Sequence, residues 1–210
     1  MSLASAETAG LVTHLLPSRI DVDTENEWRE VASQVTERRC VFFDRDGVVN
    51  RSPGPGYVLS EEEFHLHPGI AEALSFVKQR EYLAILVTSQ KGVGKGLMSG
   101  EELERIHRKM QRELHGSRAG FDAIYAFTGT DDCPFPAKPD PGLLLAAAES
   151  FFVDLRQYWM IGDADRDIQM GHAAGVAGTI RIRGEKPIQV DADHTLGSPS
   201  DLLSILEKIL

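Results

Sequence analysis

Apolar and polar residues follow two repeating patterns along this chain. Four short apolar runs have the length of a buried strand, at residues 41–43, 84–87, 123–127 and 158–161, and residues 178–182 are predicted as a fifth strand. Between them, apolar residues recur at the spacing of one helical face, as at Ile70, Ala73, Leu74 and Val77. We therefore expect strands and helices to alternate from about residue 40 to the end of the chain.

Capping and helix-stopping residues support this alternation. Pro68 suits the first turn of a helix, and Ser99 with Glu102 forms a capping box that opens another. Gly175 is a typical helix stop. The patterns predict further helices from about 140 to 151 and from 199 to 210, and an earlier one over 24–39.

The order of these elements predicts the fold class. It is α/β, a doubly wound, Rossmann-like parallel sheet of about five strands with helices on both faces. We expect residues 38–210 to form this domain and residues 1–37 to be an N-terminal extension with one helix. Single helices and loops fill the stretches between strands, so we expect no lid domain and an open site. In such sheets, ligands bind beyond the carboxyl ends of the strands.

Composition narrows the classes of function. The formal net charge of −10 argues against a nucleic-acid partner, although a local cation cluster or a metal can still bind an anionic ligand. Two cysteines are too few for a disulfide framework, which favours reduced thiols and a cytoplasmic location. No apolar run approaches the ~20 residues of a membrane span. We therefore expect no membrane partner. We also expect the protein to be a monomer or a small homo-oligomer.

Two carboxylates follow the first predicted strand. Asp44 and Asp46 are two positions apart, so their side chains leave the strand end on the same side. Such a pair repels unless a cation lies between the carboxylates or one of them holds a proton, and it suits a nucleophile beside a general acid. Gly47 lets the backbone turn away directly afterwards.

A second acidic group follows the fourth predicted strand. Asp163 ends that strand, and Asp167 lies one helical turn later on the same face. Because Mg²⁺ prefers oxygen ligands and usually takes one or two carboxylates with waters and a phosphate, we expect a magnesium site at Asp44, Asp163 and Asp167. We expect Asp165 to face solvent.

Thr88 and Lys138 are two further candidates near strand ends. Thr88 could donate its hydroxyl and backbone N–H to a phosphate oxygen, and Lys138, in a Pro-rich loop before a helix, could reach the same phosphate. Each signal is weak alone, since such residues are often merely solvated. With the acidic groups, they give the chain order Asp-x-Asp, Thr, Lys, Gly-Asp-x-x-x-Asp.

This order resembles the haloacid dehalogenase superfamily of phosphotransferases. The residues at 43–50, 56–58, 88–90 and 138–139 are similar to the branch that holds histidinol-phosphate phosphatase and D-glycero-D-manno-heptose 1,7-bisphosphate phosphatase. The resemblance covers roughly residues 40–185. It implies a magnesium-dependent phosphomonoester hydrolase for a small phosphorylated sugar-like metabolite, of the heptose bisphosphate or histidinol phosphate type.

The resemblance also implies a role for each candidate. Asp44 would be the nucleophile that forms an aspartyl-phosphate. Asp46 would be the general acid–base, with its backbone carbonyl in the metal shell. Thr88 and Lys138 would hold the phosphoryl oxygens. Of the acidic pair after the fourth strand, Asp163 would bind Mg²⁺ and its partner would support the metal directly or through water.

The residues directly after the second strand are expected to contact the substrate, namely Ser89, Gln90, Lys91 and Lys95. In the family branch this stretch forms part of the substrate-contacting wall. Its three glycines would let the backbone approach a ligand, and its lysines add positive charge. We expect Lys95 to contact a second anionic or strongly polar group of the substrate.

Two features depart from that branch. A zinc loop is often present there, but the segment 128–138 contains only Cys133 and no histidine, whereas a structural zinc takes four ligands. We therefore expect Mg²⁺ and no zinc. Ala137 replaces the arginine that is usual before the lysine, so we expect weaker binding of a bisphosphate than the branch suggests.

Two other classes of function remain open. A polynucleotide 3′-phosphatase shares the chemistry, although the acidic charge and the lack of a basic, aromatic groove weigh against it. A phospho-accepting signalling or binding module without turnover uses Asp, Thr, Lys and Mg²⁺ on a doubly wound sheet. Its lysine comes last in the chain, whereas here Gly162-Asp163 comes last, which favours the phosphatase.

Overall fold

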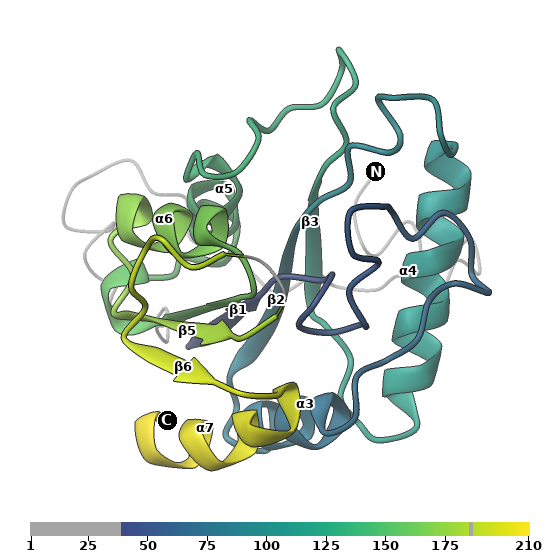
Figure 1. Ribbon diagram of the computed structural model, residues 1–210. Coiled ribbons are helices and arrows are strands. Elements are labelled where there is room, and N and C mark those ends of the chain that lie inside the picture. Colours follow the sequence, from purple (N-terminus) through teal and green to yellow (C-terminus); the bar gives the residue numbers. More distant parts are fainter. Residues whose placement is uncertain (1–38, 185–186) are drawn as a thin grey trace, which may run out of the picture. The chain divides into compact units, whose positions relative to one another are not determined.

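The computed structural model describes residues 39–184 and 187–210 (Figure 1). The predicted N-terminal extension, residues 1–37, lies outside these residues, and so does its predicted helix apart from Arg39. No helix in the described part of the chain is both long and apolar enough to cross a membrane.

A single parallel sheet organises the described domain. Its strands stand in the order β3-β2-β1-β4-β5-β6, and every neighbouring pair is parallel. The strands are β1 (Cys40–Phe43), β2 (Leu83–Ser89), β3 (Ala123–Phe127), β4 (Trp159–Gly162), β5 (Gly178–Ile182) and β6 (His194–Leu196). This arrangement confirms the predicted doubly wound, Rossmann-like α/β fold.

Helices cover both faces of the sheet (Figure 1). They are α3 (Ile70–Gln79), α4 (Gly100–His115), α5 (Gly142–Phe151), α6 (Asp165–Ala174) and α7 (Leu202–Ile209). Val41 and Phe43 pack into a core with α3, α4 and α7, whereas Cys40 and Phe42 pack into a second core with α5 and α6. This alternation follows from the period of two in a strand, and it explains why β1 is apolar at every position.

The sheet has six strands, one more than the five predicted from the sequence. β6 pairs with β5 at the sheet edge, with Ile180 opposite His194 and Ile182 opposite Leu196. The prediction missed it because β6 has only three residues, His-Thr-Leu, none of them fully buried. An edge strand contacts one neighbour and needs no continuous apolar run.

The strand order reverses between β1 and β4, which lie side by side in the middle of the sheet. Phe43 pairs with Ile161, and the Asp44 N–H donates to the Ile161 carbonyl at 2.8 Å. The chain leaves both strands at the same edge, at a topological switch point where α/β proteins bind ligands. Among the described residues, single helices, β3 and loops fill the gaps between Asp46, Thr88 and Lys138, and no lid domain is inserted.

Candidate functional site

Three buried carboxylates meet at the switch point. Asp44 follows β1 and is 3% exposed, while Asp163 follows β4 and is 4% exposed. Asp167, in the first turn of α6, is fully buried beside them. Each offers an oxygen, and these oxygens all lie within 4.8 Å of one another. The structure thus brings together the three side chains that the sequence predicted as metal ligands.

Lys138 joins two of these carboxylates. It comes from the loop before α5, and its Nζ donates to Asp44 Oδ1 and to Asp167 Oδ1, each at 2.8 Å. The second oxygen of Asp167 accepts the Ala164 N–H at 3.0 Å. Asp167 therefore holds the lysine in place and also closes the first turn of α6.

Burial and neighbouring charges shift the pKa values of Asp44 and Lys138. The pKa of Asp44 is raised to about 7, first by burial and then by the negative charge of Asp167, and Lys138 offsets these effects only in part. Burial opposes the charged form of Lys138, but the pKa of the lysine is raised because Asp167 and Asp44 outweigh that effect. Buried carboxylates gathered this closely favour a bound cation.

Two glycines let these groups approach each other. Gly47 has φ +93°, and a Cβ there would lie 2.3 Å from Asp163 Oδ2. A Cβ on Gly162 would lie 2.2 Å from the Asp167 Cβ. Any other residue at either position would push a carboxylate out of the cluster, so both glycines are part of the site's geometry.

Asp46 points into a separate network of donors. Arg45 Nη2 donates to Asp46 Oδ1 at 3.0 Å, and Asn50 Nδ2 donates to the same oxygen at 3.0 Å. Gln90 Nε2 donates to Asp46 Oδ2 at 3.0 Å and to Thr88 Oγ1 at 2.8 Å. Burial alone would raise the pKa of Asp46, but Arg45 and the hydrogen bonds lower it below its usual value. In this structure Asp46 is a carboxylate in a fixed orientation.

Arg45 and Asn50 were not among the site residues predicted from the sequence, although both contact Asp46. Both are buried, and polar side chains that lack solvent must be paired. Their closeness to Asp46 in the chain was a signal, but only the folded turn shows that both side chains fold back onto it. Gln90, a predicted substrate contact, is 1% exposed and positions Asp46 and Thr88.

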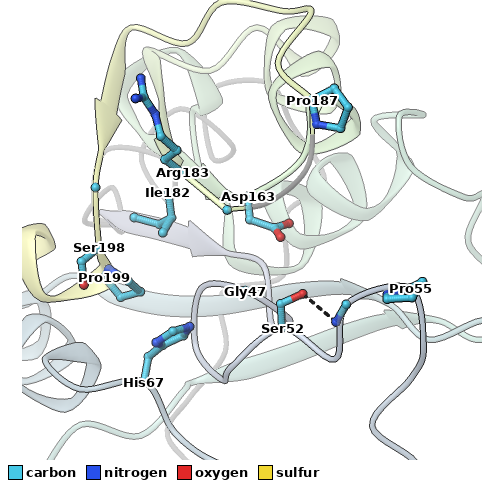
Figure 2. Close-up of a pocket in the computed structure, with 13 residues that line it drawn as sticks. Gly47, Ser52, Pro55, His67, Asp163, Ile182, Arg183, Pro187, Ser198 and Pro199 are labelled. Carbon is cyan, nitrogen blue, oxygen red and sulfur yellow. Dashed lines mark hydrogen bonds between the residues drawn. The ribbon is translucent and has the colours of Figure 1, made fainter.

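Two cavities flank the loop that follows Asn50. The larger, about 590 Å³, opens beside Gly47 and Asp163 (Figure 2). The smaller, about 170 Å³, opens beside Asp46. Ser52, Gly54 and Pro55 line both cavities and therefore separate them.

The predicted substrate contacts differ in how they meet these cavities. Ser89 and Lys91 line the smaller one. Lys95 lines neither; its Nζ lies 5.3 Å from the centre of the Tyr57 ring, and Tyr57 lines the smaller cavity. The glycines of this loop also differ from expectation, because a Cβ on Gly94 would lie 2.2 Å from the Gly129 carbonyl oxygen. Gly94 therefore allows this loop to pack closely against the loop that contains Gly129.

Asp165 does more than face solvent, which corrects the expectation from sequence. It accepts a hydrogen bond from Arg181 Nη2 at 2.7 Å and from the N–H groups of Gln189 at 3.1 Å and Val190 at 3.2 Å. These bonds hold the segment after β5, part of which lines the larger cavity (Figure 2). The sequence did not reveal this role because the partners are distant in the chain.

The lone cysteine of the predicted zinc-free loop has local partners. The Thr128 N–H donates to Cys133 Sγ at 3.4 Å, across the turn before Lys138. Within residues 39–184 and 187–210, the cluster able to hold a metal consists of the three carboxylates.

Comparisons with known proteins agree with this geometry. A family model described as haloacid dehalogenase-like hydrolase matches residues 54–175. The D-glycero-alpha-D-manno-heptose-1,7-bisphosphate 7-phosphatase of Burkholderia mallei is 33% identical, over 81% of this chain and 94% of that protein. The D-glycero-beta-D-manno-heptose-1,7-bisphosphate 7-phosphatase of Rhodopseudomonas palustris is 32% identical, over 74% of this chain and 89% of that protein.

A solved structure is similar over the same region. It is the D,D-heptose 1,7-bisphosphate phosphatase from B. bronchiseptica, crystallised with magnesium and phosphate. The TM-score is 0.71 at 28% identity, and the match covers 81% of this chain and 98% of that one.

Proposed function

This chain belongs to the haloacid dehalogenase-like hydrolase family, and from that premise we propose that it is a magnesium-dependent phosphatase of a small phosphorylated sugar. The observation that carries the proposal is the contact of Lys138 with Asp44 and Asp167 beside Asp163. The names of the relatives make a heptose 1,7-bisphosphate the first substrate to test.

The residues of the site fit a magnesium ion. Asp44, Asp163 and Asp167 present buried oxygens in one cluster, and hard oxygen ligands are what Mg²⁺ prefers. The Asp46 backbone carbonyl completes the set that we propose. Bound there, the ion supplies positive charge to the phosphoryl oxygens and to the ionised nucleophile.

The first half of the reaction transfers the phosphoryl group to Asp44. An Asp44 carboxylate oxygen attacks phosphorus, the bond from phosphorus to the sugar oxygen breaks, and an aspartyl-phosphate forms. The leaving oxygen takes a proton from Asp46. Lys138 and the Thr88 hydroxyl stabilise the charge on the transferred oxygens.

The second half hydrolyses that intermediate. Asp46 takes a proton from a water molecule, whose oxygen attacks phosphorus, and the bond to Asp44 breaks to release inorganic phosphate. The lowered pKa of Asp46 keeps its carboxylate ionised, as a proton acceptor must be. A substrate dianion beside Asp46 raises that pKa, since like charges disfavour ionisation, and so provides the proton for the first half.

Several finer points belong to the same proposal. We propose a cytoplasmic location, consistent with the free thiols of Cys40 and Cys133, and a monomer or small homo-oligomer. Histidinol phosphate and a 3′-phosphorylated oligonucleotide are the alternative substrates to test.

A substrate screen tests the proposed function directly. We expect phosphate release from a heptose 1,7-bisphosphate to exceed that from histidinol phosphate and from a 3′-phosphorylated oligonucleotide, with both anomers of the bisphosphate included. EDTA should abolish turnover and Mg²⁺ should restore it, because Asp44 is otherwise unbalanced beside its dianionic substrate. Full activity in EDTA, or preference for the oligonucleotide, would contradict the proposal.

Elemental analysis of the purified protein tests the proposal that the protein binds no zinc. We expect no stoichiometric zinc, because Cys133 contacts Thr128 and a structural zinc needs four ligands. One tightly bound zinc per chain would refute this expectation.

The Mg²⁺ effect on stability should depend on pH. The raised pKa of Asp44, about 7, means that the metal-free fold loses this group's contribution to stability as pH rises through about 7. Mg²⁺ binds the ionised form, so its increase in Tm should be larger at pH 8 than at pH 6. Thermal unfolding with and without Mg²⁺ measures this difference.

The matched variant for that experiment is Asp46→Asn, whose side chain lies outside the three-carboxylate cluster. It should keep the pH dependence of the Mg²⁺ effect. An equal increase in Tm at both pH values in the unmodified protein would disprove the role given to Asp44.

A further inference from the structure

Two cationic side chains line the smaller cavity from different elements. Lys91 belongs to the loop after β2, and Arg166 lies in the first turn of α6. Within the described chain, the Arg166 guanidinium makes no hydrogen bond or ion pair. The Lys91 Nζ lies 5.9 Å from the centre of the Phe127 ring and has no carboxylate partner there. Two unpaired cations on one cavity are notable in a chain of net charge −10.

The same cavity contains groups of the reaction centre. Asp46 lines it, together with Ser89, whose buried Oγ has no hydrogen-bond partner. A buried hydroxyl without a partner is uncommon and favours a ligand group that would complete it. The cavity therefore combines a proton-transfer carboxylate, an unused hydroxyl and two cations.

The position of Asp46 determines which cavity receives the leaving group. A general acid must lie within hydrogen-bond reach of the oxygen that it protonates. Asp46 lines the smaller cavity, whereas Asp163 and Gly47 line the larger one. The sugar that leaves must therefore extend into the smaller cavity, past Lys91 and Arg166.

We propose that Arg166 is a specificity-determining residue that binds a second phosphate on the sugar, with Lys91 opposite it. The planar guanidinium can donate two parallel hydrogen bonds to a phosphate, while the lysine adds a point charge. This inference rests on the proposed function and extends it, since it assigns a residue to the part of the substrate that does not react. Lys95 does not line this cavity, but its Nζ lies over the ring of Tyr57, which does.

The test uses a pair of substrates that differ only in the second phosphate. These are D-glycero-D-manno-heptose 1,7-bisphosphate and the corresponding 7-phosphate. For Arg166→Ala, the ratio of kcat/KM for the bisphosphate to that for the monophosphate should fall at least about tenfold, equivalent to ~1.4 kcal/mol. Arg166→Lys should give a smaller fall, because it keeps the charge and loses the fork.

Arg183→Ala is the matched control, since Arg183 is another exposed arginine and lines the larger cavity. Its ratio should equal that of the unmodified protein. An unchanged ratio in Arg166→Ala would overturn the proposal, as would equal losses on both substrates. A fall in Arg183→Ala instead would place the second phosphate in the larger cavity and also overturn it.

A binding measurement separates this inference from the proposed function. Calorimetry of the bisphosphate with Asp44→Asn protein, in Mg²⁺, needs no turnover. Adding Arg166→Ala should raise Kd at least about tenfold. If the unmodified protein hydrolyses neither sugar phosphate, the proposed function is wrong. If the Kd is unchanged by Arg166→Ala, or the bisphosphate does not bind, the role of Arg166 is wrong.

Discussion

Asp44→Asn should lower phosphatase kcat by about 10³-fold or more, because the amide has neither the charge nor the nucleophilicity of a carboxylate. The fold should survive, since the two side chains have the same shape and the ionised form of Asp44 is itself disfavoured by burial. Steady-state kinetics on the heptose bisphosphate and p-nitrophenyl phosphate, with circular dichroism to check the fold, measure both parts.

Asp46→Asn is the variant with which Asp44→Asn is compared. It removes the proton donor and base while Asp44 and Lys138 keep their contacts. Transfer from p-nitrophenyl phosphate should continue, because that leaving group needs little proton donation, and the intermediate should accumulate because no base activates water. If Asp44→Asn retained a tenth or more of the unmodified rate, the covalent mechanism would be wrong.

Lys138→Met should affect both catalysis and stability. The variant removes the ammonium that contacts Asp44 and Asp167 in a fully buried position. We expect kcat to fall by about 10²–10³-fold, as when one preorganised donor is lost. The metal-free protein should also lose about 3–5 kcal/mol of unfolding free energy, because two buried carboxylates lose their cation.

The loss of stability should depend on pH in one direction. Without Lys138, the pKa values of both carboxylates rise, so protonation relieves their repulsion at low pH and not at high pH. The destabilisation should therefore be larger at pH 8 than at pH 5 in urea unfolding without metal. Lys91→Met, an exposed lysine without a carboxylate partner in the described chain, should change stability by less than about 0.5 kcal/mol. Equal stability of Lys138→Met and the unmodified protein at both pH values would refute the structural role of this lysine.

The sequence by itself determined the fold class and the residues that meet in the candidate site. Asp44, Thr88 and Asp163 each end an apolar run, and parallel strands bring such ends to one edge of the sheet. Lys138 was predictable only from its place in the chain order, because nothing local to a Pro-rich loop shows how far its side chain reaches. In these cases the pattern of a short segment is enough, since the sheet supplies the rest of the geometry.

Tertiary structure alone decided how the surrounding side chains are used. Three sets of contacts depend on loop conformations. Gln90 and Arg45 donate hydrogen bonds to Asp46, and Asp165 accepts hydrogen bonds from the segment after β5. The same holds for the position of Arg166 on the smaller cavity, which Lys95 does not line. Packing between segments that are distant in the chain brings these residues together. The spacing of apolar residues along the chain does not predict the direction in which a loop side chain points.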